Sequence, residues 1–211
     1  LWLFFLRQPG PLLATVFTLF SMIAFIYIEP GFLAVFFVVS TILLRAIYEW
    51  LSHRFVMHVS KVPFVILNIK NPIYIMHSKH HANPSDPKSV NFGALSAVAL
   101  FIATFGIGVF FSLEAALAVT LASFSCLLLY EWFHLLSHSE VKPNSKMLKE
   151  IVARHRYHHN VDSNSCFSVS SIWADRFLGT DLPGEFADTK ESLNVLRPGY
   201  ANEESSEKLN D

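Results

Sequence analysis

Charged residues and cysteines are scarce in this sequence, and each shortage excludes a class of protein. Lysine, arginine, aspartate and glutamate make up only 16% of the 211 residues, whereas 52% are hydrophobic and 20 are phenylalanine. Such a composition is typical of membrane proteins rather than soluble ones. The formal net charge of −1 gives no reason to expect nucleic acid as a partner. The length suits one domain.

The two cysteines, Cys126 and Cys166, lie in an apolar stretch and in a polar segment. A disulfide framework is therefore not expected, and no cysteine pattern typical of a zinc finger or an iron–sulfur cluster occurs. The sequence begins Leu1-Trp2-Leu3 without a methionine, so we expect further residues upstream, and a signal peptide cannot be judged.

Long uncharged runs predict an all-α integral membrane protein. Two pairs of apolar stretches are each separated by a short turn, at Glu29-Pro30-Gly31 and around Ser112 and Glu114. Each stretch is close to the roughly 20 residues that a spanning helix needs. The sequence therefore predicts two transmembrane hairpins. The four predicted spans cover about residues 11–28, 32–51, 92–111 and 115–133.

The polar segments 52–91 and 134–211 are expected outside the hydrocarbon. Within the first, 62–75 is compatible with a helix at the membrane surface, and 83–87 is rich in turn residues. We interpret residues 1–182 as one membrane domain. The polar tail, 183–211, is expected to be poorly ordered beyond Pro198.

With four spans, both polar segments lie on the same side of the membrane. Neither predicted outer turn contains a lysine or arginine, whereas the polar segments hold nearly all of them. The positive-inside rule then predicts a cytoplasmic cap in a multi-pass protein. The membrane would be the endoplasmic reticulum in a eukaryote and the inner membrane in a bacterium.

All ten histidines fall into four short clusters, two of which read H-x-x-H-H. Imidazole is a common ligand of iron, zinc and copper, and ten imidazoles suit two ions better than one. Positions i, i+3 and i+4 share a helix face, so each H-x-x-H-H is expected to aim three rings at one point. The clusters are His53 and His58; His77, His80 and His81; His134 and His138; and His155, His158 and His159.

Other interpretations are open at this point. The basic residues beside the clusters, Arg54, Lys79, Arg154 and Arg156, could form a cationic patch for lipid headgroups. A histidine-rich membrane protein could also bind haem or transport metal ions. Transport predicts ionisable residues in the middle of the spans, where this sequence has almost none. A cationic patch does not explain why every histidine is clustered.

The two histidine pairs differ in spacing. His134 and His138, at i and i+4, share a helix face. His53 and His58, at i and i+5, diverge by about 140° on a regular helix, so they serve different ions or the helix is broken between them.

A short sequence repeat precedes these pairs. Tyr48-Glu49-Trp50 precedes the first pair and Tyr130-Glu131-Trp132 the third cluster. If the two halves of the chain are structural repeats, they would place two equivalent ligand sets about a pseudo-twofold axis.

The type of ligand limits which metals are expected at the site. Zinc is redox-inert and usually takes four ligands, and magnesium prefers carboxylates. Nitrogen-rich sites suit iron, which can activate O2. Metal-bound histidines donate their other N–H to an acceptor. Four carboxylates near the clusters are candidate acceptors: Glu49, Glu131, Asp162 and Asp175.

These motifs resemble the fatty acid hydroxylase/sterol desaturase superfamily, most closely its fatty acid hydroxylase branch. The four histidine clusters occur in that order, and the flanks agree: Glu49-Trp50-Leu51-Ser52-His53-Arg54-Phe55, His80-His81-Ala82-Asn83-Pro84-Ser85-Asp86-Pro87 and Trp173-Ala174-Asp175-Arg176-Phe177-Leu178-Gly179-Thr180. The resemblance covers about residues 30–182.

The resemblance implies a di-metal centre held by the ten histidines, with two irons at work and zinc possible in isolated protein. It implies an O2-dependent lipid hydroxylase that inserts oxygen into a C–H bond, an activity of lipid biosynthesis. A desaturase with the same site and a silent, zinc-filled relative stay open. No haem-binding His-Pro-Gly-Gly occurs, so electrons are expected from a separate donor: cytochrome b5, a ferredoxin or a reductase.

Overall fold

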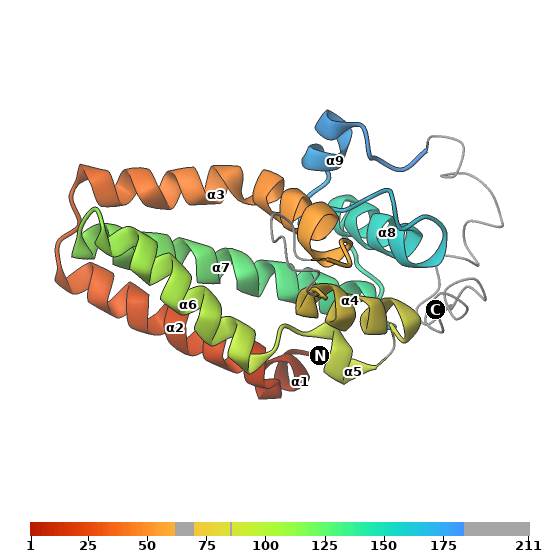
Figure 1. The fold of residues 1–211 in the computed structure, drawn as a ribbon, viewed down its shortest axis with the longest axis horizontal. Helices are drawn as coiled ribbons and strands as arrows, with labels where there is room; N and C mark the ends of the chain where they lie inside the picture. The colour runs from red at the N-terminus through yellow and green to blue at the C-terminus, as the bar shows by residue number, and fades with distance from the viewer. Residues whose placement is uncertain (62–69, 85, 184–211) are drawn as a thin grey trace. The chain divides into compact units, whose positions relative to one another are not determined.

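The structure is a computed structural model that describes residues 1–61, 70–84 and 86–183 (Figure 1). In this part of the chain the secondary structure is helical, apart from one isolated bridge between Lys61 and Lys70. The all-α prediction is thus confirmed. The prediction of a surface helix over 62–75 lies mostly outside the described residues, and Pro72 to Ile75 begin a helix of their own. The prediction for the tail beyond Pro198 lies outside them as well.

Three described helices are long and apolar enough to cross a membrane, which identifies a membrane protein. They are α2 (Pro9–Tyr27), α3 (Phe32–Ser52) together with the turn η1 (His53–Met57), and α7 (Leu113–Ser137). The predicted span at 92–111 is α6 (Ala94–Val109), which has only 16 residues. Shorter helices complete the order: α1 (Trp2–Arg7), α4 (Pro72–Ala82), α5 (Pro87–Val90), α8 (Lys146–Asn160) and α9 (Trp173–Leu178).

The chain forms two compact units. The first, called here the span unit, contains Leu1–Arg45 and Asn91–Trp132; the second, called the histidine unit, contains Ala46–Val90 and the chain from Phe133 onward. All ten histidines therefore belong to the histidine unit.

Aromatic and small residues hold the span unit together. Phe124 of α7 is fully buried against Phe17 of α2, and Phe17 stacks on Phe101 of α6 at 4.5 Å between ring centroids. At the other end of α7, the ring of Trp132 stacks on Trp2 at 3.7 Å. Two buried alanines, Ala14 of α2 and Ala97 of α6, pack in the same cluster as Phe124.

Two glycines of the span unit allow close backbone approach. A Cβ on Gly10 would lie 1.6 Å from the carbonyl oxygen of Phe92, and one on Gly108 would lie 2.3 Å from Cα of Ala116. Backbone atoms cannot move aside as a flexible side chain can, so no larger residue fits. The sharp return from α6 into α7 depends on Gly108.

Hydroxyl groups inside the apolar helices are satisfied locally. Thr15, Thr18 and Thr104 each donate to the carbonyl oxygen four residues earlier, at 2.8, 2.8 and 2.9 Å. A hydroxyl bonded to its own helix can face lipid without an unpaired donor.

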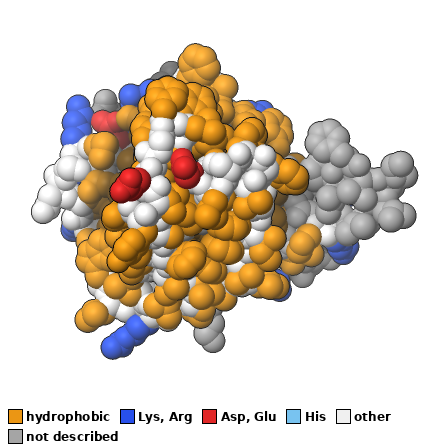
Figure 2. Space-filling model, turned by 90° about the vertical axis from the view of Figure 1, so that its left-hand side faces the viewer, with side chains coloured by type: hydrophobic (Ala, Val, Ile, Leu, Met, Phe, Trp, Pro, Cys, Tyr) orange, Lys and Arg blue, Asp and Glu red, His pale blue; other side chains and the backbone are white. Residues whose placement is uncertain are grey.

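The outer surface of the span unit is apolar. Ile26 of α2, Leu43 of α3 and Leu95 of α6 are 67%, 67% and 83% exposed. Hydrophobic side chains likewise dominate the face drawn in Figure 2, where charged side chains are few. Such a surface is stable in lipid and not in water.

Local sequence signals explain the helices of the histidine unit. The side chain of Asn71 caps α4 by accepting from the amide of Ile73, and Pro72 occupies the first turn. Ser145 caps α8 through the amide of Leu148. Gly179, in the left-handed conformation at φ 73°, ends α9.

A small core joins three elements of the histidine unit. Ala46 and Trp50 of α3 pack with Phe167 and with Ala174 of α9. The indole N–H of Trp50 donates to the hydroxyl of Thr180 at 2.8 Å, so the ring is buried with its donor satisfied. This core fixes the loop between α8 and α9 against the end of α3.

Candidate metal centre

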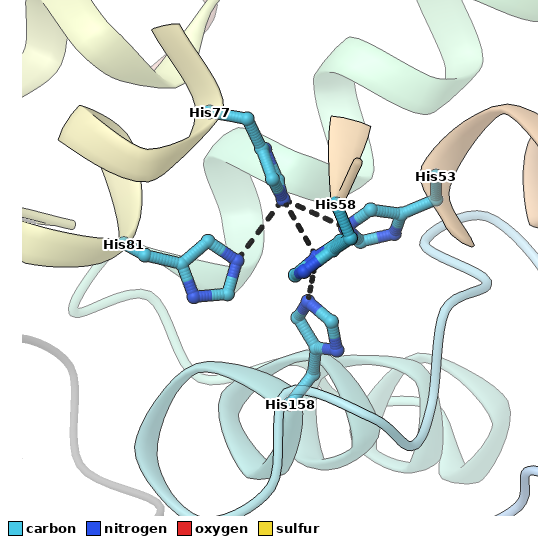
Figure 3. Close-up of side chains that lie close together, drawn as sticks. All are labelled: His53, His58, His77, His81 and His158. Atoms are coloured by element: carbon cyan, nitrogen blue, oxygen red, sulfur yellow. Dashed lines mark hydrogen bonds between the residues drawn. The ribbon is translucent and has the colours of Figure 1, made fainter. Parts of the chain in front are cut away.

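The ten histidines gather in two groups of five. In each group one ring nitrogen from every histidine lies within 4.8 Å of the corresponding nitrogens of the others. The prediction that ten ligands form two sites, not one, agrees with this arrangement. The first group contains His53, His58, His77, His81 and His158 (Figure 3). The second group contains His80, His134, His138, His155 and His159.

The H-x-x-H-H motifs do not aim three rings at one point, so that prediction is wrong. In α4, His77 and His81 belong to the first group, whereas His80 belongs to the second. Side chains at i and i+4 overlie one another more closely than those at i and i+3. The i and i+4 histidines of α4 accordingly stay in one group, while the middle histidine belongs to the other.

The same division occurs in α8. His155 and His159, at i and i+4, belong to the second group, and His158 belongs to the first. When the histidines of the first half of the chain are paired in order with those of the second half, each member of one group corresponds to a member of the other. The two groups are therefore equivalent, as the sequence repeat predicts. The repeat did not indicate that each half also contributes one histidine to the other half's group.

The pair His53 and His58 serves one group because the helix is not regular between them. Residues His53–Met57 form a π-turn, closed by the amide of His58 on the carbonyl of His53 at 3.2 Å. A π-turn has five residues where an α-turn has four, so i and i+5 come to one side. Of the two alternatives, the structure agrees with an interruption of the regular helix, because the π-turn brings both histidines into one group.

The corresponding pair needs no such turn. The amide of His138 bonds the carbonyl of His134 at 3.2 Å, which is the ordinary spacing of an α-helix. The first half thus carries one extra residue, and the π-turn absorbs it. π-Turns of this kind are frequent at functional sites.

The nitrogen spacing within the first group suits a shared cation. Nε2 of His77 lies 3.0 Å from Nε2 of His53, of His58 and of His81 (dashed lines in Figure 3). One imidazole nitrogen has a single proton or a single lone pair, so it cannot satisfy three neighbours by hydrogen bonding. Two ligands at right angles, each about 2.1 Å from an ion, would be roughly 3.0 Å apart.

The second group has the same spacing. Nε2 of His138 lies 3.1 Å from Nε2 of His80 and 3.0 Å from Nε2 of His155. Both ring nitrogens of His159 are buried and have no hydrogen-bond partner in the described part of the chain. A buried nitrogen without a partner costs free energy, which an ion would recover for the one nitrogen that it binds.

The two groups are close neighbours. The rings of His81 and His159, one from each group, stack at 4.0 Å between centroids. Burial, and then the neighbouring imidazoles, hold the pKa of both residues well below the usual range. Burial alone lowers the pKa of His58 to about 4. These rings are neutral at neutral pH, which is the form that binds metal.

Two histidines of the first group are oriented by main-chain oxygens. Nδ1 of His53 lies 2.5 Å from the carbonyl oxygen of Phe167, and Nδ1 of His158 lies 2.7 Å from that of Ser165. A carbonyl can only accept, so Nδ1 carries the proton and Nε2 keeps its lone pair. We expected carboxylates as the acceptors; in these two bonds the acceptors are carbonyls.

The four predicted carboxylates bind other donors. Glu49 accepts from the amides of Val169 and Ser170 and from the hydroxyl of Ser170. Asp175 accepts from two further amides of the same loop, and Asp162 accepts from the amide of Asn164 and the hydroxyl of Ser165. In the span unit, Glu131 accepts from the amide of Phe92 at 2.8 Å.

Three of the four basic residues suggested for a cationic patch are engaged inside the fold. Arg154 pairs with Asp181 at 2.7 Å, and Arg156 donates to the carbonyls of Ser137 and Ser139. The guanidinium of Arg54 lies 5.0 Å from the ring centroid of Trp50. Of the four, only Lys79 is exposed. These contacts give three of the four residues a role inside the fold.

Sequence reasoning missed the main-chain contribution to the site. The carbonyls of Ser165 and Phe167 face the histidines because Cys166 between them has a left-handed backbone, with φ of 54°. The cluster of Asp, Ser and Asn at 162–165 predicts a turn, but no residue type indicates which carbonyl a turn presents.

The fold and these groups define a helical membrane protein with two histidine groups that are compatible with metal binding. The chain belongs to the fatty acid hydroxylase family, whose model matches residues 37–180. That range contains all ten histidines, and the family lies within the fatty acid hydroxylase/sterol desaturase superfamily. Comparisons with curated proteins and with solved structures find no match.

Proposed function

We propose that this protein is an O2-dependent di-iron hydroxylase that inserts oxygen into a C–H bond of a fatty acyl chain or related lipid. The observation that carries the proposal is the pair of five-histidine groups, in a chain that belongs to the fatty acid hydroxylase family. Iron bound at both groups would supply the activation of O2 and the oxidation of the lipid.

The contribution of the chain is to hold ten imidazoles in the metal-binding form. The rings are neutral because they are buried together, and two of them are fixed in one tautomer by Phe167 and Ser165. The five ligands of each group come from separate parts of the chain, so the site forms only in the folded protein.

The membrane arrangement is part of the proposal. The apolar spans would place both groups at the membrane boundary, where an insoluble lipid can reach them from the bilayer. We propose four spans in two hairpins, with the histidine unit on the cytoplasmic side, where a separate donor such as cytochrome b5, a ferredoxin or a reductase would deliver electrons.

Lipid analysis of an expressing host tests the function. The wild-type chain is expected to produce a lipid heavier by 16 mass units, the mass of one added oxygen, and His155→Ala is expected to abolish it. A product lighter by two mass units, again lost in His155→Ala, would establish a desaturase instead. No lipid change, together with haem absorbance and no bound non-haem metal, would contradict both.

A further inference from the structure

One loop supplies the oxygens that orient the first histidine group. The carbonyls of Ser165 and Phe167, two residues apart, accept from Nδ1 of His158 and of His53. These histidines come from α8 and from the end of α3, so the loop sets the angle between ligands from two different helices. Cys166 is fully buried, and its amide donates to the carbonyl of Thr180 at 2.7 Å.

Two carboxylates fix the four amides that follow. Asp175 accepts from the amides of Phe167 and Ser168, both at 2.9 Å, and Glu49 accepts from those of Val169 and Ser170. Four successive N–H groups thus point at two anions. The amide of Ser168 shares a peptide plane with the carbonyl of Phe167, so Asp175 fixes that carbonyl directly. The carbonyl of Ser165 shares its plane with the amide of Cys166, which bonds Thr180, a residue that Asp175 holds in turn. The hydroxyl of Thr180 gives Asp175 a third donor at 2.7 Å.

We propose that Asp175 and Glu49 are positioning residues for the first histidine group, acting through the main chain of 165–170. Their role is to position the histidines and not to bind the ion. Their carboxylates hold the loop so that its carbonyls fix the tautomer and angle of His53 and His158. The inference rests on the proposed metal centre and deepens it, because it makes the affinity of one group depend on residues that the other does not use.

The requirement is for a carboxylate and not only for a side chain of that shape. An ionised carboxylate is purely an acceptor, whereas an amide would direct an N–H group at one of the three donors around Asp175. Asp175 is fully buried, so the displaced donor could not turn to water. Glu49 is only half-buried, and its amide variant keeps one oxygen for the loop, so Glu49→Gln is the milder change.

Cobalt(II) titration of the metal-free, full-length protein in detergent tests the proposal. The absorbance of bound Co²⁺ should rise in two phases, which His81→Ala and His80→Ala assign to the first and second groups. Asp175→Asn and Glu49→Gln are each expected to weaken the phase assigned to the first group, by on the order of 10- to 100-fold for Asp175→Asn. The other phase should be unchanged.

Asp181→Asn is the matched control. It removes the same charge from the same end of the chain, but Asp181 binds Arg154 and Arg176 rather than the loop amides. We expect a lower Tm and two unchanged affinities. Equal weakening of both phases in Asp175→Asn and Glu49→Gln, or no weakening, would overturn the inference and leave the metal centre standing. Failure of the wild type to bind Co²⁺ would overturn the proposed function itself.

Discussion

The two histidine groups have matching ligands but different support. Each contains a histidine pair from the end of a long helix, the i and i+4 histidines of one H-x-x-H-H motif, and the middle histidine of the other motif. In the first group, His53 and His158 donate to loop carbonyls. In the second, His134 bonds the main chain of Val90, whereas Nδ1 of His155 and both nitrogens of His159 have no hydrogen-bond partner among the described residues.

Both groups bring ring nitrogens to about 3.0 Å of one another, so this spacing is common to the two candidate metal sites. The hydrogen bonds that orient the rings, in contrast, differ between the groups. The loop of 165–170 is a support for the first group only. If each group binds one ion, we therefore expect the two ions to differ in affinity and in their response to substitution, although five imidazoles would hold each.

Neighbouring histidines of α4 give the largest expected effect. His80→Ala should remove the ion of the second group and His81→Ala that of the first, although the two residues are adjacent in sequence. Either change should lower activity by more than about 100-fold, since even residues behind the ligands cost 10- to 100-fold. Metal analysis and lipid profiling measure both effects.

Ser78 offers the control within the same helix, because it lies between the histidines of α4 and belongs to neither group. Ser78→Ala should retain both ions and the activity. If His80→Ala and His81→Ala removed the same ion, the exchange of middle histidines between groups would be wrong.

The π-turn gives a second, smaller effect. Deleting Met57 shortens the spacing from His53 to the next ligand to i and i+4, which an α-turn accommodates as it does between His134 and His138. We expect this variant to keep two ions, with the Co²⁺ affinity of the first group reduced by less than about tenfold.

The paired control is deletion of Leu136 from α7, which leaves the two histidines of that helix at i and i+3. This variant should lose the ion of the second group. Loss of the first ion in the Met57 deletion, with retention of the second in the Leu136 deletion, would contradict the role given to the π-turn.

Residue type and spacing predict some features of this protein and leave others open. The apolar runs predicted the helices, and the clustering of all ten histidines predicted that they come together, because both depend on residue type and spacing. The division of each H-x-x-H-H motif between groups depends on how α4 and α8 are rotated against each other, and spacing does not give that rotation. The acceptors of His53 and His158 are backbone atoms, which every residue carries.

The pKa values give the smallest expected effect, on the stability of the metal-free protein. Burial lowers the pKa of His77, His155 and His158 in the folded state, so the unfolded chain binds more protons once pH falls below the usual value of 6.5. Stability should be full above that value and be lost as pH falls toward about 4, where His58 titrates. The Tm of the metal-free protein in detergent should decrease from pH 7.5 to pH 5.

Bound metal should oppose this loss, since protons and the ion compete for the same nitrogens. With saturating Co²⁺ the decrease in Tm should move to lower pH. A Tm that stays constant or rises on acidification of the metal-free protein would show that the histidines are not held neutral by the fold.

Metal analysis of wild-type protein purified without oxygen, combined with X-ray absorption at the iron edge, tests whether each five-histidine group binds one ion. We expect about two irons per chain, each surrounded by imidazole nitrogens at about 2.1 Å. One iron per chain, or iron in a haem, would contradict the assignment of one ion to each five-histidine group.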